Sequence, residues 1–138
     1  MNGPEPAVLL MARAPRLGEV RRALEPLLGR EGCLELQAAL IAHAAAWARQ
    51  ISSVPIHVAH DPPDAGAELR RLVGADAVMF PQNGEGIAGR LADASARVLE
   101  KLGMRCEAQL VENEWIKGEW QSEIVYALLA AEFRDAGS

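Results

Sequence analysis

Short, continuous apolar runs alternate along this chain with longer segments in which apolar residues recur at helical spacing. Continuous runs of this kind are typical of strands that are covered on both faces. They predict strands over residues 8–11, 54–60 and 77–80. Residues 106–111 alternate apolar and polar positions instead, which predicts a fourth strand that is less buried or lies at an edge.

Helices are predicted between and after these strands. The expected helices cover residues 20–28, 31–51, 65–73, 87–102 and 119–135. In the helix at 31–51, one apolar stripe is expected to face the core; it consists of Leu36, Leu40, Ala44, Trp47 and Ile51. Asp64 is placed to cap the helix at 65–73, and Gly103 is placed to end the helix at 87–102.

Strands that alternate with helices indicate a parallel sheet with right-handed crossovers. The expected fold is a single α/β domain over residues 1–138, with residues 1–6 as a flexible end. It has three layers: a mainly parallel sheet of about four strands, with helices on both faces.

Composition narrows the classes of partner. The net charge of −5 and the pI near 5.2 argue against a general nucleic-acid binder, which would present a basic face. No apolar run approaches the ~20 residues that a membrane span needs, and the first residues lack the pattern of a secretory signal. We therefore expect a soluble, cytoplasmic protein without nucleic-acid or membrane partners.

The charge is unevenly distributed, because residues 13–30 contain five arginines and two glutamates. A loop with Pro15 and Gly18 follows the first strand and carries much of this cluster. Ligands of open α/β sheets bind at the carboxyl ends of the strands. Arg13 and Arg21 are therefore candidates for contacts with a diphosphate, although the loop matches neither the dinucleotide nor the Walker pattern. The alternative is an arginine cluster that is simply solvated.

Two further polar segments follow predicted strands. In the glycine-rich turn at 82–89 and just after it, Gln82, Gly84 and Arg90 are candidates to contact the same ligand; a turn that merely needs glycine is the alternative. After the fourth strand, Glu114 is a candidate ligand for Mg²⁺ or Mn²⁺ that bridges to phosphates. An acid in a solvent-facing loop is the alternative reading of Glu114.

The carboxyl-terminal segment is rich in aromatic residues, since four of the six lie in the last 24 positions. A helix over residues 119–135 would be apolar on two sides, more than one sheet face can cover. This excess predicts a subunit interface and a homo-oligomer, most simply a homodimer. The alternative is a terminal helix that packs wholly inside one domain.

Two segments resemble a known family. The opening reads MARAPRLGEVRRALEPLLG, and a later segment reads FPQNGEGIAGRLADASARVL. In order and spacing they resemble a family of bacterial transferase-like proteins with the glycosyltransferase A-type fold, labelled radical-SAM/selenodomain-associated transferase type 1. The resemblance covers about residues 7–103. It implies a sheet related to nucleotide-diphospho-sugar transferases, with a nucleotide bound over the first half of the domain.

The resemblance also implies roles for particular residues. Arg13 and Arg21 take the places of two family lysines, and would neutralise phosphates. The positions that match directly include Pro15, Gly18, Gln82, Gly84 and Arg90. Glu114 stands where the family has a metal-binding aspartate.

The chain departs from the family pattern in three respects. Ala23 replaces a family arginine, the segment around Glu114 lacks the Gly, Thr and Pro of the metal motif, and the chain is shorter than the family's usual length. The expected function is that of a glycosyltransferase-like or nucleotidyltransferase-like protein that binds a nucleotide-diphospho-sugar. The alternative is a non-catalytic, oligomeric α/β binding module that keeps the fold without the activity.

Overall fold

The computed structural model describes residues 6–136 of the chain. The chain divides into two compact units, Met1–Ala94 and Ser95–Ser138, each with a sheet of its own. The expected flexible end at residues 1–6 lies outside the described residues except for Pro6. Across the described range, no helix combines the length and apolar content that a membrane crossing requires.

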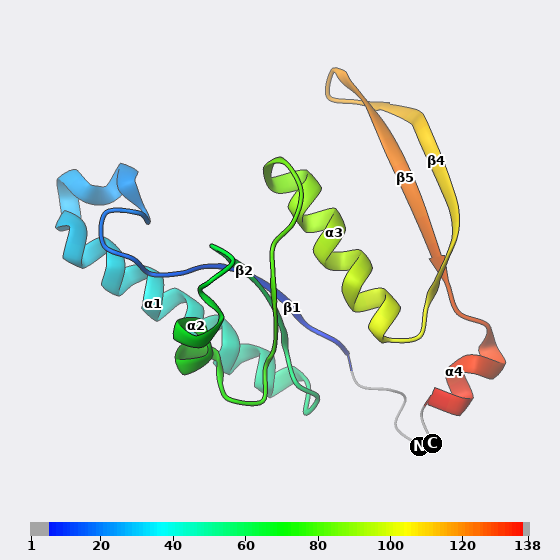
Figure 1. The fold of residues 1–138 in the computed structure, drawn as a ribbon, viewed down its shortest axis with the longest axis horizontal. Helices are drawn as coiled ribbons and strands as arrows, with labels where there is room; N and C mark the ends of the chain where they lie inside the picture. The colour runs from blue at the N-terminus through cyan, green and yellow to red at the C-terminus, as the bar shows by residue number, and fades with distance from the viewer. Residues whose placement is uncertain (1–5, 137–138) are drawn as a thin grey trace. The chain divides into compact units, whose positions relative to one another are not determined.

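The first unit contains a three-stranded parallel sheet in the order β1-β2-β3. The strands are β1 (Leu9–Arg13), β2 (His57–Asp61) and β3 (Val78–Pro81), as Figure 1 shows. These three predicted strands are confirmed, and each ends one or two residues later than expected. Because the strands are parallel, their carboxyl ends share one edge of the sheet.

The connection between β1 and β2 is mostly helical. A 3-10 turn, η1 (Arg22–Leu24), leads into α1 (Glu25–Ile51). Pro26 is tolerated in the first turn of α1, where a backbone N–H would have no intrahelical partner. The backbone leaves helical geometry at Gly29, between the two helices predicted for this region.

The next helix, α2 (Gly66–Val73), connects β2 to β3. The prediction that Asp64 caps this helix is wrong. Ala65 occupies the N-cap position, and no side chain forms a capping hydrogen bond there. Asp64 pairs with Arg16 instead, at 3.1 Å. The Asp64 carboxylate therefore accepts from a guanidinium in place of the backbone N–H groups that a capping aspartate would satisfy.

Helices α1 and α2 form a core with the sheet. Its members include Ile41, Ala45, Ala48, Val58, Leu69 and Val73. The apolar stripe predicted for α1 is wrong, since Leu40, Trp47 and Ile51 are exposed. Apolar residues, many of them alanines, lie on every side of this helix, so periodicity could not select the buried face. The face that packs carries alanines, whose small side chains let α1 lie close to the sheet.

Helix α3 (Gly86–Lys101) begins in the first unit and ends in the second. It confirms the helix predicted after the third strand. Gly103 ends it as expected: its N–H donates to the Glu100 carbonyl, and the Met104 N–H donates to the Leu99 carbonyl, both at 3.0 Å. This pair of bonds defines a Schellman motif.

The second unit contains an antiparallel hairpin of β4 (Arg105–Ile116) and β5 (Glu119–Ala127), followed by the short helix α4 (Ala130–Ala136). Two predictions are therefore wrong. The strand predicted at 106–111 is confirmed within β4, but it pairs in this hairpin, so the parallel sheet has three strands and not the expected four. The helix expected at 119–135 is a strand for most of its length.

The turn of the hairpin explains both errors. Lys117 and Gly118 have φ values of 52° and 87°, and two-residue hairpin turns favour positive φ at both positions. Beside this turn Trp115 faces Trp120, with ring centroids 5.3 Å apart in an edge-to-face arrangement. Such cross-strand aromatic pairs stabilise hairpins. The fold is α/β, with a three-stranded parallel sheet and a separate two-stranded antiparallel one.

Candidate functional site

A cavity of about 650 Å³ lies in the first unit, at the edge where the parallel strands end. Its polar lining residues are Arg13, Glu19, Arg21, Gln37, Asp61, Gln82 and Arg90, and its apolar ones are Met11, Val20, Ile87 and Leu91. The volume falls in the range of small-molecule sites. Three arginines against two acids leave one positive charge in excess, which suits an anionic ligand.

Asp61 joins two of the arginines. Its Oδ2 lies 3.5 Å from the Nε of Arg13 and 3.5 Å from an Nη of Arg90. Asp61 ends β2, Arg13 ends β1 and Arg90 lies on α3, so three elements contribute to one charged cluster. The carboxylate side chain is only 21% exposed, whereas that of Arg13 is 62% exposed. This arrangement keeps the two like charges of Arg13 and Arg90 close together and leaves both side chains accessible to solvent.

The third arginine is held by α1. The Nε of Arg21 donates to the Gln37 side-chain oxygen at 2.9 Å, and the Gln37 amide nitrogen donates to the Arg13 carbonyl at 2.9 Å. The Cys33 thiol donates to the Arg21 carbonyl at 3.3 Å. One face of α1 therefore links the end of β1 to the loop that carries Arg21.

The glycine-rich turn after β3 closes the cavity from another side. Gln82 lines the cavity while its side-chain nitrogen donates to the Ala59 carbonyl at 3.0 Å. Gly84 does not line the cavity, but the turn requires it: its φ is +116°, and a Cβ there would lie 2.9 Å from the Gly89 carbonyl group. The predicted site residues Gln82 and Arg90 thus meet Arg13 and Arg21, while Gly84 shapes the turn that leads to α3.

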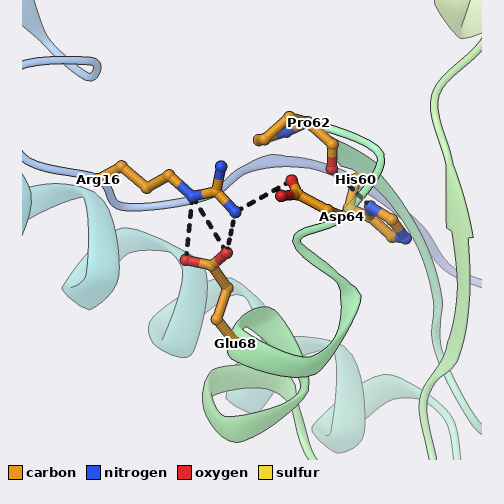
Figure 2. Close-up of polar contacts among 5 residues, drawn as sticks. All are labelled: Arg16, His60, Pro62, Asp64 and Glu68. Carbon is orange, nitrogen blue, oxygen red and sulfur yellow. Dashed lines mark hydrogen bonds and ion pairs between the residues drawn. The ribbon is translucent and has the colours of Figure 1, made fainter.

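Arg16, in the same basic loop, forms ion pairs with Glu68 on α2 and with Asp64 just before it. Figure 2 shows its guanidinium between Glu68 and Asp64; the Nε lies 3.1 Å from a Glu68 oxygen, and a terminal nitrogen also contacts that carboxylate. Chiefly the Glu68 hydrogen bond, and then Asp64, raise the pKa of Arg16 above its ordinary value. These contacts tie the loop to α2. Pro15 and Gly18 lie on either side of Arg16 in sequence and belong to the loop, without lining the cavity.

Glu114 lies on β4 of the second unit, opposite Gln121, and is exposed. Among the described residues, no three metal-ligating side chains lie together. The role of Glu114 as a ligand of Mg²⁺ or Mn²⁺ stays a prediction, and we derive no step through a metal.

Sequence reasoning missed Asp61 and Gln37. Asp61 could have been found, because it follows a predicted strand at the same edge as the arginines. Gln37 carried no such signal, since it lies on the helix face that periodicity did not select.

No protein-family model matches the chain, and no curated protein matches it in sequence. Among solved structures, it is similar to a protein from Desulfovibrio desulfuricans G20 described as a "putative nucleotide-diphospho-sugar transferase". The likeness has a TM-score of 0.59 and 18% sequence identity, and covers 69% of this chain. At this sequence identity the likeness shows a shared fold alone, and it does not show membership of the radical-SAM-associated family. The chain spans 42% of that protein's length.

Proposed function

We propose that the cavity binds the diphosphate of a nucleotide or nucleotide sugar, as part of a glycosyltransferase-like or nucleotidyltransferase-like site. The observation that carries the proposal is the convergence of Arg13, Arg21 and Arg90 on one cavity at the carboxyl edge of the sheet. A transferase-like fold supports it. Guanidinium groups bind phosphate oxygens through paired, charge-assisted hydrogen bonds.

The other residues that line the cavity suit the base and the sugar of such a ligand. Met11, Ile87 and Leu91 provide an apolar wall that could cover one face of a base or sugar. Asp61 and Gln82 offer hydrogen-bond groups to hydroxyls beside the phosphates.

In a transfer reaction, the diphosphate leaves with its negative charge. Arginines fixed around it would stabilise that charge as it develops. The proposal assigns this role to Arg13, Arg21 and Arg90, and assigns no catalytic base and no metal.

Arg21→Ala tests this proposal, with Arg22→Ala as a matched control. Arg21 lines the cavity, whereas its neighbour Arg22, which is also exposed, does not. Titration calorimetry with nucleoside diphosphates and nucleotide sugars should show binding weakened roughly tenfold or more by Arg21→Ala, since charged hydrogen bonds contribute about 1.5–3 kcal/mol. Arg22→Ala should bind like the wild type. Equal affinities for all three proteins would refute the phosphate role of Arg21.

A second candidate function is a non-catalytic module that self-associates through the hairpin. The observation that favours it is the exposure of Trp115 and Trp120, at 59% and 57%. Exposed tryptophans are enriched at protein interfaces. Light scattering should then give a dimer for the wild type and a lower mass for Trp120→Ala; a monomeric wild type would remove this candidate.

A further inference from the structure

Gln37 is a buried amide with both of its polar ends engaged at the cavity. Its side chain donates to the Arg13 carbonyl and accepts from the Nε of Arg21, each at 2.9 Å. The residue is only 7% exposed. A buried amide that uses its donor and its acceptor in this way is fixed in one orientation. It therefore defines where the Arg21 guanidinium lies relative to the end of β1.

The backbone of Arg21 adds a second, independent observation. Its φ and ψ are 52° and 35°, the left-handed region that residues with a Cβ rarely occupy. The thiol of Cys33, one helical turn before Gln37, donates to the Arg21 carbonyl at 3.3 Å. Unfavourable backbone geometry of this kind persists where the surroundings enforce it, and it clusters at ligand clamps.

From these contacts we infer that Gln37 is a positioning residue, which holds Arg21 in its binding orientation before any ligand arrives. This inference rests on the proposed function of the cavity. The bond to Gln37 occupies the Nε of Arg21 and leaves the two terminal nitrogens to face an anion. An arginine that is already ordered loses less conformational freedom on binding, so its fixed position raises affinity.

A double-mutant cycle on pyrophosphate binding tests this role. Gln37→Leu should weaken binding roughly two- to tenfold, the effect of having to order one long side chain on binding. In the Arg21→Ala background, the same change should have almost no further effect, because Gln37 acts through Arg21. Gln50→Leu, an exposed glutamine on the same helix, is the matched control and should bind like the wild type. Equal losses in both backgrounds, or no loss in either, would overturn the inference.

A measurement without ligand separates this inference from the proposed function. In NMR spectra of the unliganded protein, the Nε–H of Arg21 should exchange with water more slowly than that of exposed Arg22. Gln37→Leu should abolish the difference; if the leucine variant does not fold, Gln37→Asn, whose shorter amide cannot span both partners, replaces it. A protein that shows this protection but does not bind pyrophosphate would refute the proposed function alone. An Arg21 that exchanges as fast as Arg22 in the wild type would refute the positioning role.

Discussion

The two units of this chain use their apolar residues in different ways. In the first, Val58, Leu69 and Val73 are fully buried in one core. In the second, Trp115 and Trp120 remain more than half exposed. Parallel strands pair only through long crossover connections, so their sheet requires a covering helix, whereas a hairpin forms from neighbouring residues. The first unit is thus built by long-range packing and the second by local contacts.

This difference determines where a ligand site can be built. The cavity is lined entirely by residues of the first unit, from β1, β2, α1, α3 and the loops between them. Side chains that must hold a fixed geometry need rigid supporting elements. The buried core supplies that rigidity to Arg13 and Asp61 at the strand ends.

The largest expected effect comes from removing a buried side chain from the core of the first unit. Leu69→Ala removes a side chain that is completely buried, and should lower the free energy of unfolding by about 2–5 kcal/mol. Leu110→Ala makes the same change on β4, where the leucine is 42% exposed, and should cost below about 1 kcal/mol. Urea denaturation of both variants measures the contrast. Similar losses would mean that the two units do not differ as described.

A smaller effect is expected from the carboxylate inside the cavity. Asp61→Asn removes a negative charge beside Arg13 and Arg90, and should strengthen pyrophosphate binding by about tenfold, as loss of a nearby repelling charge does. Asp64→Asn is the control, because Asp64 pairs with Arg16, which does not line the cavity. Calorimetry decides the matter: weaker binding by Asp61→Asn would show that Asp61 is needed to hold the arginines in place.

The smallest expected effect is the pH dependence of a helix cap in the second unit. The Leu129 N–H, and secondarily Arg105, lower the pKa of Glu132 below its ordinary value of 4.5. Because the folded-state pKa is depressed, this contribution to the stability of α4 is complete above about pH 4.5 and is lost as the pH falls through the lower value. The carboxylate at the third helical position reaches back to the capping N–H, which is half of a capping box.

Hydrogen exchange of the Leu129 amide reports this titration directly. Protection should fall on acidification in the wild type and should be low at all pH values in Glu132→Ala, which lacks the accepting oxygen. An amide that is equally protected at pH 3 and pH 6 would contradict the assignment.

The parts of this fold that local sequence determines were predictable. Continuous apolar runs marked β1, β2 and β3, and strand-end loops identified Arg13, Arg21, Gln82 and Arg90 as residues that would meet. These predictions rest on local periodicity, which marks the strands, and on the general rule that the carboxyl ends of parallel strands share one edge.

The errors arose where tertiary packing or a single turn decided the outcome. Residues 119–127 have apolar positions compatible with helical spacing, yet the turn at Lys117 and Gly118 brings them back along β4. Gln37 was missed because the buried face of α1 depends on which side chains allow close approach to the sheet. Neither choice is visible in local periodicity.

The central claim, that the arginine cavity is a nucleotide diphosphate site, is tested most directly by thermal unfolding with a panel of nucleoside diphosphates and nucleotide sugars. Parallel runs with Mg²⁺ or Mn²⁺ show whether a metal ion contributes. A ligand at about a hundred times its dissociation constant should stabilise the native state by about 2.7 kcal/mol. The account predicts such a shift for at least one member of the panel in the wild type, and its loss in Arg21→Ala. No shift with any member, or a shift that Arg21→Ala retains in full, would contradict it.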